Sequence, residues 1–172
     1  MSSPSLRRRL GRRKPLRSGA ATASLPRRRL IEAARRVRPN AYAPYSRYRC
    51  GAAVLAGSGR IFSGVNVETP TLIGHVCAER NAIFSAITAG EREILAVATV
   101  SEGSEPCGNC RQMILEFGRG DIPVYSVHQA FPSGKPRVVS TSISRLMPMA
   151  HTAMKFDSPP LARKPAGRKR SP

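Results

Sequence analysis

Three of the four cysteines in this chain stand where a helix is predicted to begin. Cys77 opens residues 77–89, where apolar residues recur at helical spacing before a glycine. Cys107 and Cys110 stand at the start of residues 107–117, behind a proline that suits the first turn of a helix. Side chains three positions apart share one helix face, so the last two sulfurs can converge on a single ion.

The surroundings of these sulfurs favour the thiolates that zinc binds. Helix amino termini and the neighbouring Arg80 and Arg111 lower thiol pKa values. Three thiolates leave the fourth position of a tetrahedral zinc open, which distinguishes a catalytic site from a closed structural one. The sequence therefore predicts a zinc centre at Cys77, Cys107 and Cys110. A purely structural zinc is the alternative, and it would be expected to take a fourth protein ligand.

Glu79 lies two residues from Cys77, beside the predicted metal without being an obvious ligand. There it can take a proton from a zinc-activated water and return it to a leaving amine. A Cys-x-x-Cys pair alone is weak evidence, because redox sites and structural zinc sites contain it too. Cys77-Ala78-Glu79 followed by Pro106-Cys107-Gly108-Asn109-Cys110 is far more specific, because it is the three-cysteine form of the zinc deaminase signature.

At these residues the chain resembles the small, homotetrameric cytidine deaminases, over residues 30–150. The resemblance implies zinc-dependent hydrolytic deamination of cytidine or deoxycytidine to uridine or deoxyuridine, with release of ammonia, in pyrimidine salvage. It also implies a nucleoside substrate and a homotetramer. The other matching segments are Ala43-Pro44-Tyr45-Ser46, Gly51-Ala52-Ala53, Gly64-Val65-Asn66-Val67-Glu68 and Leu146-Met147-Pro148.

The resemblance assigns roles to individual substrate-binding residues. In the family, the asparagine and glutamate of the Asn-Val-Glu segment bind the ribose, which assigns Asn66 and Glu68 to sugar recognition. The backbone of Ala78 and the carboxylate of Glu79 are expected to hold the base. An aromatic ring at the position of Tyr48 is expected to pack against it.

Charge balance at the metal is a further expectation. Three thiolates and one divalent zinc leave a net charge of about −1, which opposes ionisation of a bound water. Positive charge beside the sulfurs would offset this excess. The family resemblance gives this role to Arg80, and Arg111 is a second candidate.

Three places depart from the family pattern. Tyr48 stands where phenylalanine is usual, and Thr69-Pro70-Thr71-Leu72 replaces the usual Asn-Ala-Ser-Tyr at the pocket rim. His151 occupies the place of a carboxy-terminal phenylalanine that reaches a neighbouring subunit's site in relatives. Blasticidin S deaminases share the zinc motif but lack the glutamate, so Glu68 favours a ribonucleoside. The altered loop leaves a modified or antibiotic cytosine nucleoside as an alternative.

The order of helix and strand patterns predicts an α/β fold. Strands that alternate with helices need crossover connections and a sheet covered on both faces. We therefore expect a three-layer α/β/α domain of the cytidine deaminase type, with a mixed five-stranded sheet. The expected helices are residues 30–37, 77–89, 107–117 and 142–146, and the expected strands are residues 50–55, 61–67, 94–100, 124–127 and 138–139.

The net charge of +19 lies mainly at the two ends of the chain. Residues 1–29 contain ten basic residues and no acidic one, and residues 152–172 contain six basic residues and one acidic. Both ends lack periodic apolar residues, so we predict disordered basic tails around a zinc deaminase domain at residues 30–151. The first tail is most simply a solvated extension. Organelle import and contact with nucleic acid or polyphosphate are alternatives.

Two other functions compete with a nucleoside deaminase. A zinc-stabilised nucleic-acid-binding module would use the basic tails, but it gives Glu79 no task. A deaminase of polynucleotides would use the tails as an electrostatic guide, whereas a pocket closed by adjacent subunits suits free nucleosides. No apolar run approaches the roughly 18 residues of a membrane span. Thiols held by zinc suit a reducing compartment, so the expected location is the cytoplasm.

Overall fold

The computed structural model describes residues 20–71, 73–103, 105–118, 120–129 and 135–151. Its strands form one five-stranded sheet in the order β2-β1-β3-β4-β5. The strands are β1 (Gly51–Ala56), β2 (Ile61–Val65), β3 (Ile94–Ser101), β4 (Pro123–His128) and β5 (Arg137–Ser142). The helices are α1 (Ala20–Val37), the 3-10 turn η1 (Arg38–Asn40), α2 (Ala78–Thr88), α3 (Gly108–Phe117) and α4 (Ile143–Leu146).

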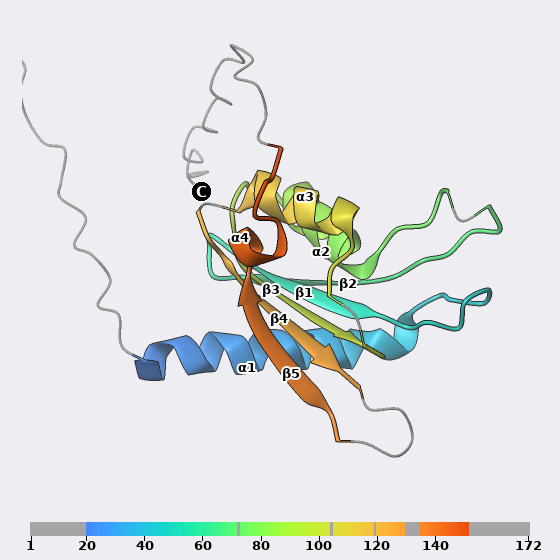
Figure 1. Ribbon diagram of the computed structural model, residues 1–172, viewed down its shortest axis with the longest axis horizontal. Helices are drawn as coiled ribbons and strands as arrows, with labels where there is room; N and C mark the ends of the chain where they lie inside the picture. The colour runs from blue at the N-terminus through green and yellow to red at the C-terminus, as the bar shows by residue number, and fades with distance from the viewer. Residues whose placement is uncertain (1–19, 72, 104, 119, 130–134, 152–172) are drawn as a thin grey trace, which may run out of the picture.

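The sheet is mixed, as predicted. β1 pairs antiparallel with both β2 and β3, β4 pairs antiparallel with β5, and β3 and β4 run parallel. The parallel pair needs a crossover connection, and α3 supplies it. Helix α1 covers one face of the sheet, and α2, α3 and α4 lie on the other (Figure 1). The expected three-layer α/β/α arrangement is confirmed.

Two cores lie on the two faces of the sheet, and β1 contributes to both. Ala52 and Val54 pack among residues of α2 and α3, whereas Ala53 packs among residues of α1. All three are fully buried. On β2, a Cβ atom at Gly64 would lie 2.7 Å from the carbonyl oxygen of Ala78. Glycine therefore allows the start of α2 to approach the sheet closely.

Helix α1 corrects the predicted boundary between tail and domain. It begins at Ala20, so residues 20–29, expected in a disordered tail, are helical. Three alanines among its first four residues favour the helix. Leu30 anchors it in the core, and a helix once nucleated extends at little cost. Residues 1–19 and 152–172, in the predicted tails, lie outside the described residues.

The other elements match the sequence patterns closely, with one clear difference. α2 and α3 begin one residue later than predicted, with Cys77 and Cys107 as their N-cap residues. β5 has six residues, whereas the pattern predicted only residues 138–139. Its polar residues were not recognised as strand, and pairing with the whole of β4 supports them. None of the described helices combines the length and apolar character needed to cross a bilayer.

Candidate active site

The sulfur atoms of Cys77, Cys107 and Cys110 form one cluster at the starts of α2 and α3. The Sγ atoms of Cys77 and Cys107 are 3.8 Å apart, those of Cys107 and Cys110 are 3.6 Å apart, and all three lie within 4.8 Å of one another. Zn–S bonds of about 2.3 Å at tetrahedral angles place sulfurs roughly 3.8 Å apart. The thiols therefore fit one zinc ion. Across the described residues, no fourth cysteine, histidine or carboxylate joins the cluster.

Local backbone geometry brings these cysteines together. Cys77 and Cys107 each precede a helix in an extended conformation, with ψ angles of 154° and 169°. Both helices pack on the same face of the sheet (Figure 1). Their amino ends carry partial positive charge, which stabilises thiolates there.

The pKa values of Cys77 and Cys110 are shifted in opposite directions. Hydrogen bonds with Cys110 and Cys107, opposed by partial burial, lower the pKa of Cys77 to about 5. His75 and Arg80 act in the same direction. The pKa of Cys110 is raised, because its proton is held in the hydrogen bond with Cys77 and its sulfur is buried. A negative charge concentrated on this cluster suits a divalent cation.

The two arginines expected to balance this charge make different contacts. An Nη2 nitrogen of Arg80 donates to the carbonyl oxygen of His75 at 2.8 Å, and the charge of Arg80 lowers the pKa of Cys77. The Nε of Arg80 is buried and lacks a hydrogen-bond partner among the described residues. Arg111 instead donates to the carbonyl oxygens of Pro106 at 2.7 Å and Leu146 at 2.8 Å. Arg111 thus ties α3 to the end of α4.

A cavity of about 200 Å³ opens beside the sulfurs. All five residues that the sequence assigned to substrate binding or catalysis line it: Tyr48, Asn66, Glu68, Ala78 and Glu79.

One acidic residue of the same cavity wall is not predicted by any sequence motif. Glu105 lines the cavity, and its Oε1 lies 3.4 Å from the Nε2 of His128. Its only sequence signal was its position two residues before Cys107. Cys50 and His75 also line the cavity.

Glu79 is the most buried acid of this site. It lies in the first turn of α2 and is only 5% exposed. Burial raises the pKa of its carboxyl group, and the charge of Cys77 acts in the same direction. A carboxyl group with a raised pKa beside a metal cluster suits both donation and acceptance of a proton near neutral pH.

Glu68 is held in place by the loop that precedes β1. Its Oε2 accepts hydrogen bonds from the backbone N–H groups of Tyr45 and Ser46, both at 3.1 Å. Its Oε1 accepts a hydrogen bond from the Ser46 hydroxyl. These bonds, the hydroxyl first, lower the pKa of Glu68. An ionised carboxylate is thus fixed in the cavity wall.

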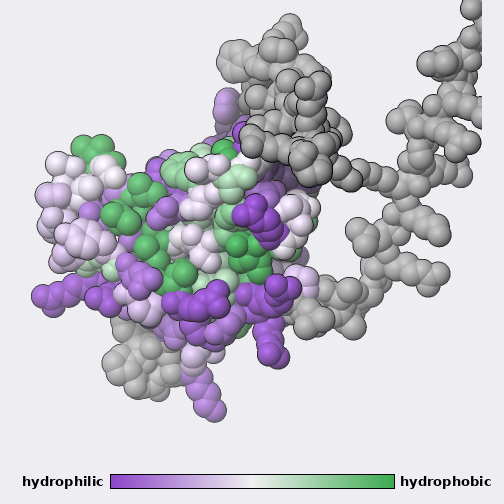
Figure 2. Space-filling model, turned by 180° about the vertical axis from the view of Figure 1, so that it is seen from behind, coloured by the Kyte–Doolittle hydropathy of each residue, from purple (hydrophilic) through white to green (hydrophobic). Residues whose placement is uncertain are grey.

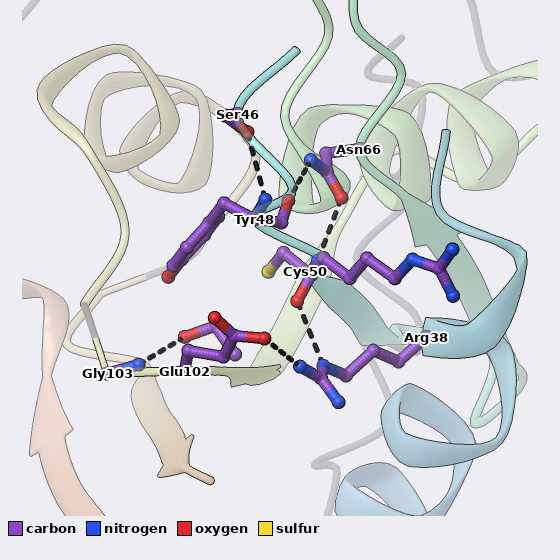
Figure 3. Close-up of polar contacts among 9 residues, drawn as sticks. Arg38, Ser46, Tyr48, Cys50, Asn66, Glu102 and Gly103 are labelled. Carbon is purple, nitrogen blue, oxygen red and sulfur yellow. Dashed lines mark hydrogen bonds and ion pairs between the residues drawn. The ribbon is translucent and has the colours of Figure 1, made fainter. Parts of the chain in front are cut away.

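Asn66 joins two segments of the same wall. Its Oδ1 accepts a hydrogen bond from the backbone N–H of Cys50 at 2.8 Å, and its Nδ2 donates to the carbonyl oxygen of Tyr48 at 2.7 Å (Figure 3). The side chain therefore fixes the backbone that carries Tyr48. This contact could not be predicted from the sequence, because the partners lie 16 and 18 positions away.

The three departures from the family pattern fall in different places. Tyr48 lines the cavity. Leu72 lies outside the described residues. His151 is exposed, and its carbonyl oxygen accepts a hydrogen bond from the Nε2 of Gln112 at 3.1 Å.

Comparisons with known proteins agree with this geometry. Residues 26–126 match the family described as the cytidine and deoxycytidylate deaminase zinc-binding region. The cytidine deaminase of Sporosarcina psychrophila is 38% identical over 125 residues, which cover 71% of this chain and 88% of the relative. The cytidine deaminase of Halalkalibacterium halodurans is 36% identical over 132 residues, which cover 75% of this chain and 96% of the relative.

Solved structures show the same similarity. The crystal structure of cytidine deaminase from Burkholderia pseudomallei has a TM-score of 0.62 and 42% identity, over 72% of this chain and 98% of that one. That of the Mycobacterium tuberculosis enzyme has a TM-score of 0.60 and 33% identity, over 73% of this chain and 97% of that one. The chain therefore belongs to the family of zinc-dependent cytidine and deoxycytidylate deaminases.

Proposed function

We propose that this protein hydrolyses cytidine and deoxycytidine to uridine and deoxyuridine with release of ammonia, a reaction of pyrimidine salvage. The observation that carries this proposal is the position of buried Glu79 in the wall of a cavity that also contains Cys77 and Cys107 of the zinc cluster. This chain aligns with most of the length of the cytidine deaminases that it resembles.

Glu79 moves the protons in the proposed reaction. Cys77, Cys107 and Cys110 would hold the Zn²⁺, which would lower the pKa of a water molecule toward about 7. Glu79 accepts a proton from the attacking water and gives it to N3 of the cytosine. As the C4–N bond breaks, Glu79 carries the remaining hydroxyl proton to the amino group, which leaves as ammonia while O4 becomes a carbonyl oxygen. One carboxyl group thus serves in both directions, and such groups contribute typically about 10²–10⁴-fold.

Charge in the cavity favours a nucleoside over a nucleotide. Glu68, Glu79 and Glu105 line it, and no lysine or arginine does so in the described part of the chain. A phosphate group would meet these carboxylates without a cation to pair with. Asn66 and Glu68 take the ribose hydroxyls in this assignment, Tyr48 packs against the base and the backbone of Ala78 holds it.

A substrate panel tests this function on the purified full chain with its zinc content measured. We expect loss of the cytosine absorbance with cytidine and deoxycytidine, and little with cytidine 5′-monophosphate, blasticidin S or a cytosine oligonucleotide. Glu79→Gln should lose at least 10²-fold in kcat while it keeps zinc. The matched control is Glu116→Gln, at an exposed carboxylate on α3, which should retain activity. If the Glu79→Gln protein lost its zinc, Glu79 would be a metal ligand, which would contradict the assignment.

The quaternary structure in this proposal is a homotetramer. Large apolar side chains are exposed on the single chain, and Figure 2 shows hydrophobic residues among hydrophilic ones on one face. Tyr42 is 57% exposed, Ile73 93% and Phe84 43%. Light scattering after gel filtration should give four times the chain mass of 18.6 kDa. A monomeric active enzyme would contradict this.

The proposed location is the cytoplasm. All four cysteines are free thiols, three of them at the zinc cluster. Thiols persist in reducing compartments. Fractionation of the source cells should find the protein with cytoplasmic markers.

A further inference from the structure

Helix α1 carries a group of arginines that the deaminase site does not use. Arg28, Arg29 and Arg36 line a groove of about 350 Å³ together with Ile61 and Ser63 of β2. All three arginines are exposed. Figure 2 shows hydrophilic side chains gathered along the edge of the molecule where Figure 1 places α1.

In the part of the chain that the structure describes, none of these three guanidinium groups is paired with a carboxylate. Of the described residues that line the groove, Glu32 is the one acid, and it pairs with Arg35 at 3.6 Å. Like charges held around one groove repel one another, and an anion placed among them removes that cost. Arginine forks bind phosphate oxygens in two-point contacts.

The sequence extends this charge beyond the helix. Residues 1–19 contain seven basic residues and no acidic one, and they lead directly into α1. A long stretch of positive charge favours a polymer of phosphates over a single phosphorylated metabolite. Among the residues that the structure describes, no aromatic side chain lines the groove, so none is available there for a base to stack on. Contacts would therefore go to the sugar–phosphate backbone.

We propose that the groove between α1 and β2 binds the phosphate backbone of nucleic acid, independently of sequence. Helix α1 covers the face of the sheet opposite the helices that carry the zinc cluster (Figure 1). No described residue lines both the groove and the deaminase cavity. Nucleic acid on this face thus leaves the nucleoside cavity accessible.

The test measures fluorescence anisotropy of a labelled 20-nucleotide thymidylate strand with the zinc-loaded full chain, between 0.05 and 0.3 M salt. Each phosphate neutralised on a single strand contributes about −0.7 to the slope of log K against log salt. Removing three contacts should therefore reduce the slope by about 2 and weaken binding at least about tenfold at 0.1 M salt. The test variant combines Arg28→Ala, Arg29→Ala and Arg36→Ala.

A matched control removes the same charge elsewhere. It combines substitutions of three exposed arginines outside α1 and should keep most of the wild-type slope. The control substitutions are Arg92→Ala, Arg137→Ala and Arg145→Ala.

Three results would overturn the proposal: no binding by the wild type at 0.1 M salt, equal loss in both variants, or wild-type binding by the groove variant. If the groove variant binds the strand as the wild type does but also self-associates, the arginines instead prevent the β2 edge strand from pairing with other chains. Cytidine turnover on the same samples should be unchanged in both variants. It tests the deaminase function separately.

Discussion

The guanidinium of Arg38 lies 2.9 Å from the carboxylate of Glu102, and this ion pair joins two segments that reach the same cavity. The Nε of Arg38 also donates to the carbonyl oxygen of Arg49 at 2.9 Å, between Tyr48 and Cys50 (Figure 3). Glu102 begins the connection that leads from β3 to Glu105 and the second part of the zinc cluster.

We expect Arg38→Met to lower kcat/KM clearly and to lower the free energy of unfolding only slightly, because the substitution separates the two segments that form the cavity wall. The pair is partly exposed, so solvent screening limits its contribution to about 1 kcal/mol of unfolding free energy. Steady-state kinetics and thermal melts measure the two effects. Arg35→Met, which breaks the exposed pair with Glu32, is the control and should change neither. Unchanged kinetics in Arg38→Met would show that Arg38 does not position the cavity wall.

Ser46 holds the carboxylate assigned to the ribose. Its hydroxyl and backbone N–H both donate to Glu68. Ser46→Ala removes the hydroxyl bond to Glu68 and the bond that the hydroxyl accepts from the backbone N–H of Tyr48 at 3.0 Å, and it keeps the two backbone bonds to Glu68. Both losses loosen groups assigned to substrate binding, so we expect KM for cytidine to rise about 2–10-fold with a smaller change in kcat. A fall in kcat with unchanged KM would show that Glu68 acts on the reaction step and not on sugar binding.

Gly64 controls the distance between β2 and α2. A methyl group there would lie 2.7 Å from the carbonyl oxygen of Ala78 and closer still to the backbone nitrogen of Ala82. Gly64→Ala should therefore destabilise the fold by about 1–3 kcal/mol, and displace Cys77 and Glu79 with the helix. The matched control for thermal melts is Gly108→Ala, where a Cβ meets no atom within 4 Å. Equal melting temperatures for the two variants would contradict this account.

Metal removal should change thiol reactivity in a set order. In the zinc-loaded protein we expect no fast-reacting thiol, because the cluster is ligated and burial raises the pKa of Cys50. After chelation, Cys77 and Cys107 should react rapidly with a disulfide reagent, because they are accessible and the pKa of Cys77 is about 5. Buried Cys110 and Cys50 should react slowly. Added zinc should restore protection and activity together, and rapid reaction in the loaded protein would argue against the ligand set.

Arg80 should act through the metal site. Its charge favours the thiolate of Cys77, so Arg80→Ala should weaken zinc affinity and lower kcat with little change in KM. Arg80→Lys keeps the charge and should retain more activity. Competition with a zinc indicator measures the affinity. A KM defect with unchanged kcat would contradict this role.

Local sequence patterns were sufficient to predict which three sulfurs cluster and in what order the helices and strands follow one another. Cys77, Cys107 and Cys110 stand at helix starts that short-range spacing reveals, and Glu79 follows from its place beside the first. The full lengths of α1 and β5 could not be predicted from these patterns. Packing against the sheet supports the start of α1, and pairing with β4 supports β5, although the residues themselves have only a weak pattern.

Contacts between distant residues came only from the tertiary structure. The bridge from Asn66 to the backbone of residues 48–50, the Arg38–Glu102 pair and the entry of Glu105 into the cavity join positions far apart in the chain or depend on loop geometry. The groove of arginines on α1 exists only because β2 supplies its second wall. Composition fixes how much charge a chain carries, whereas folding decides which charges face one another and which are left without a partner.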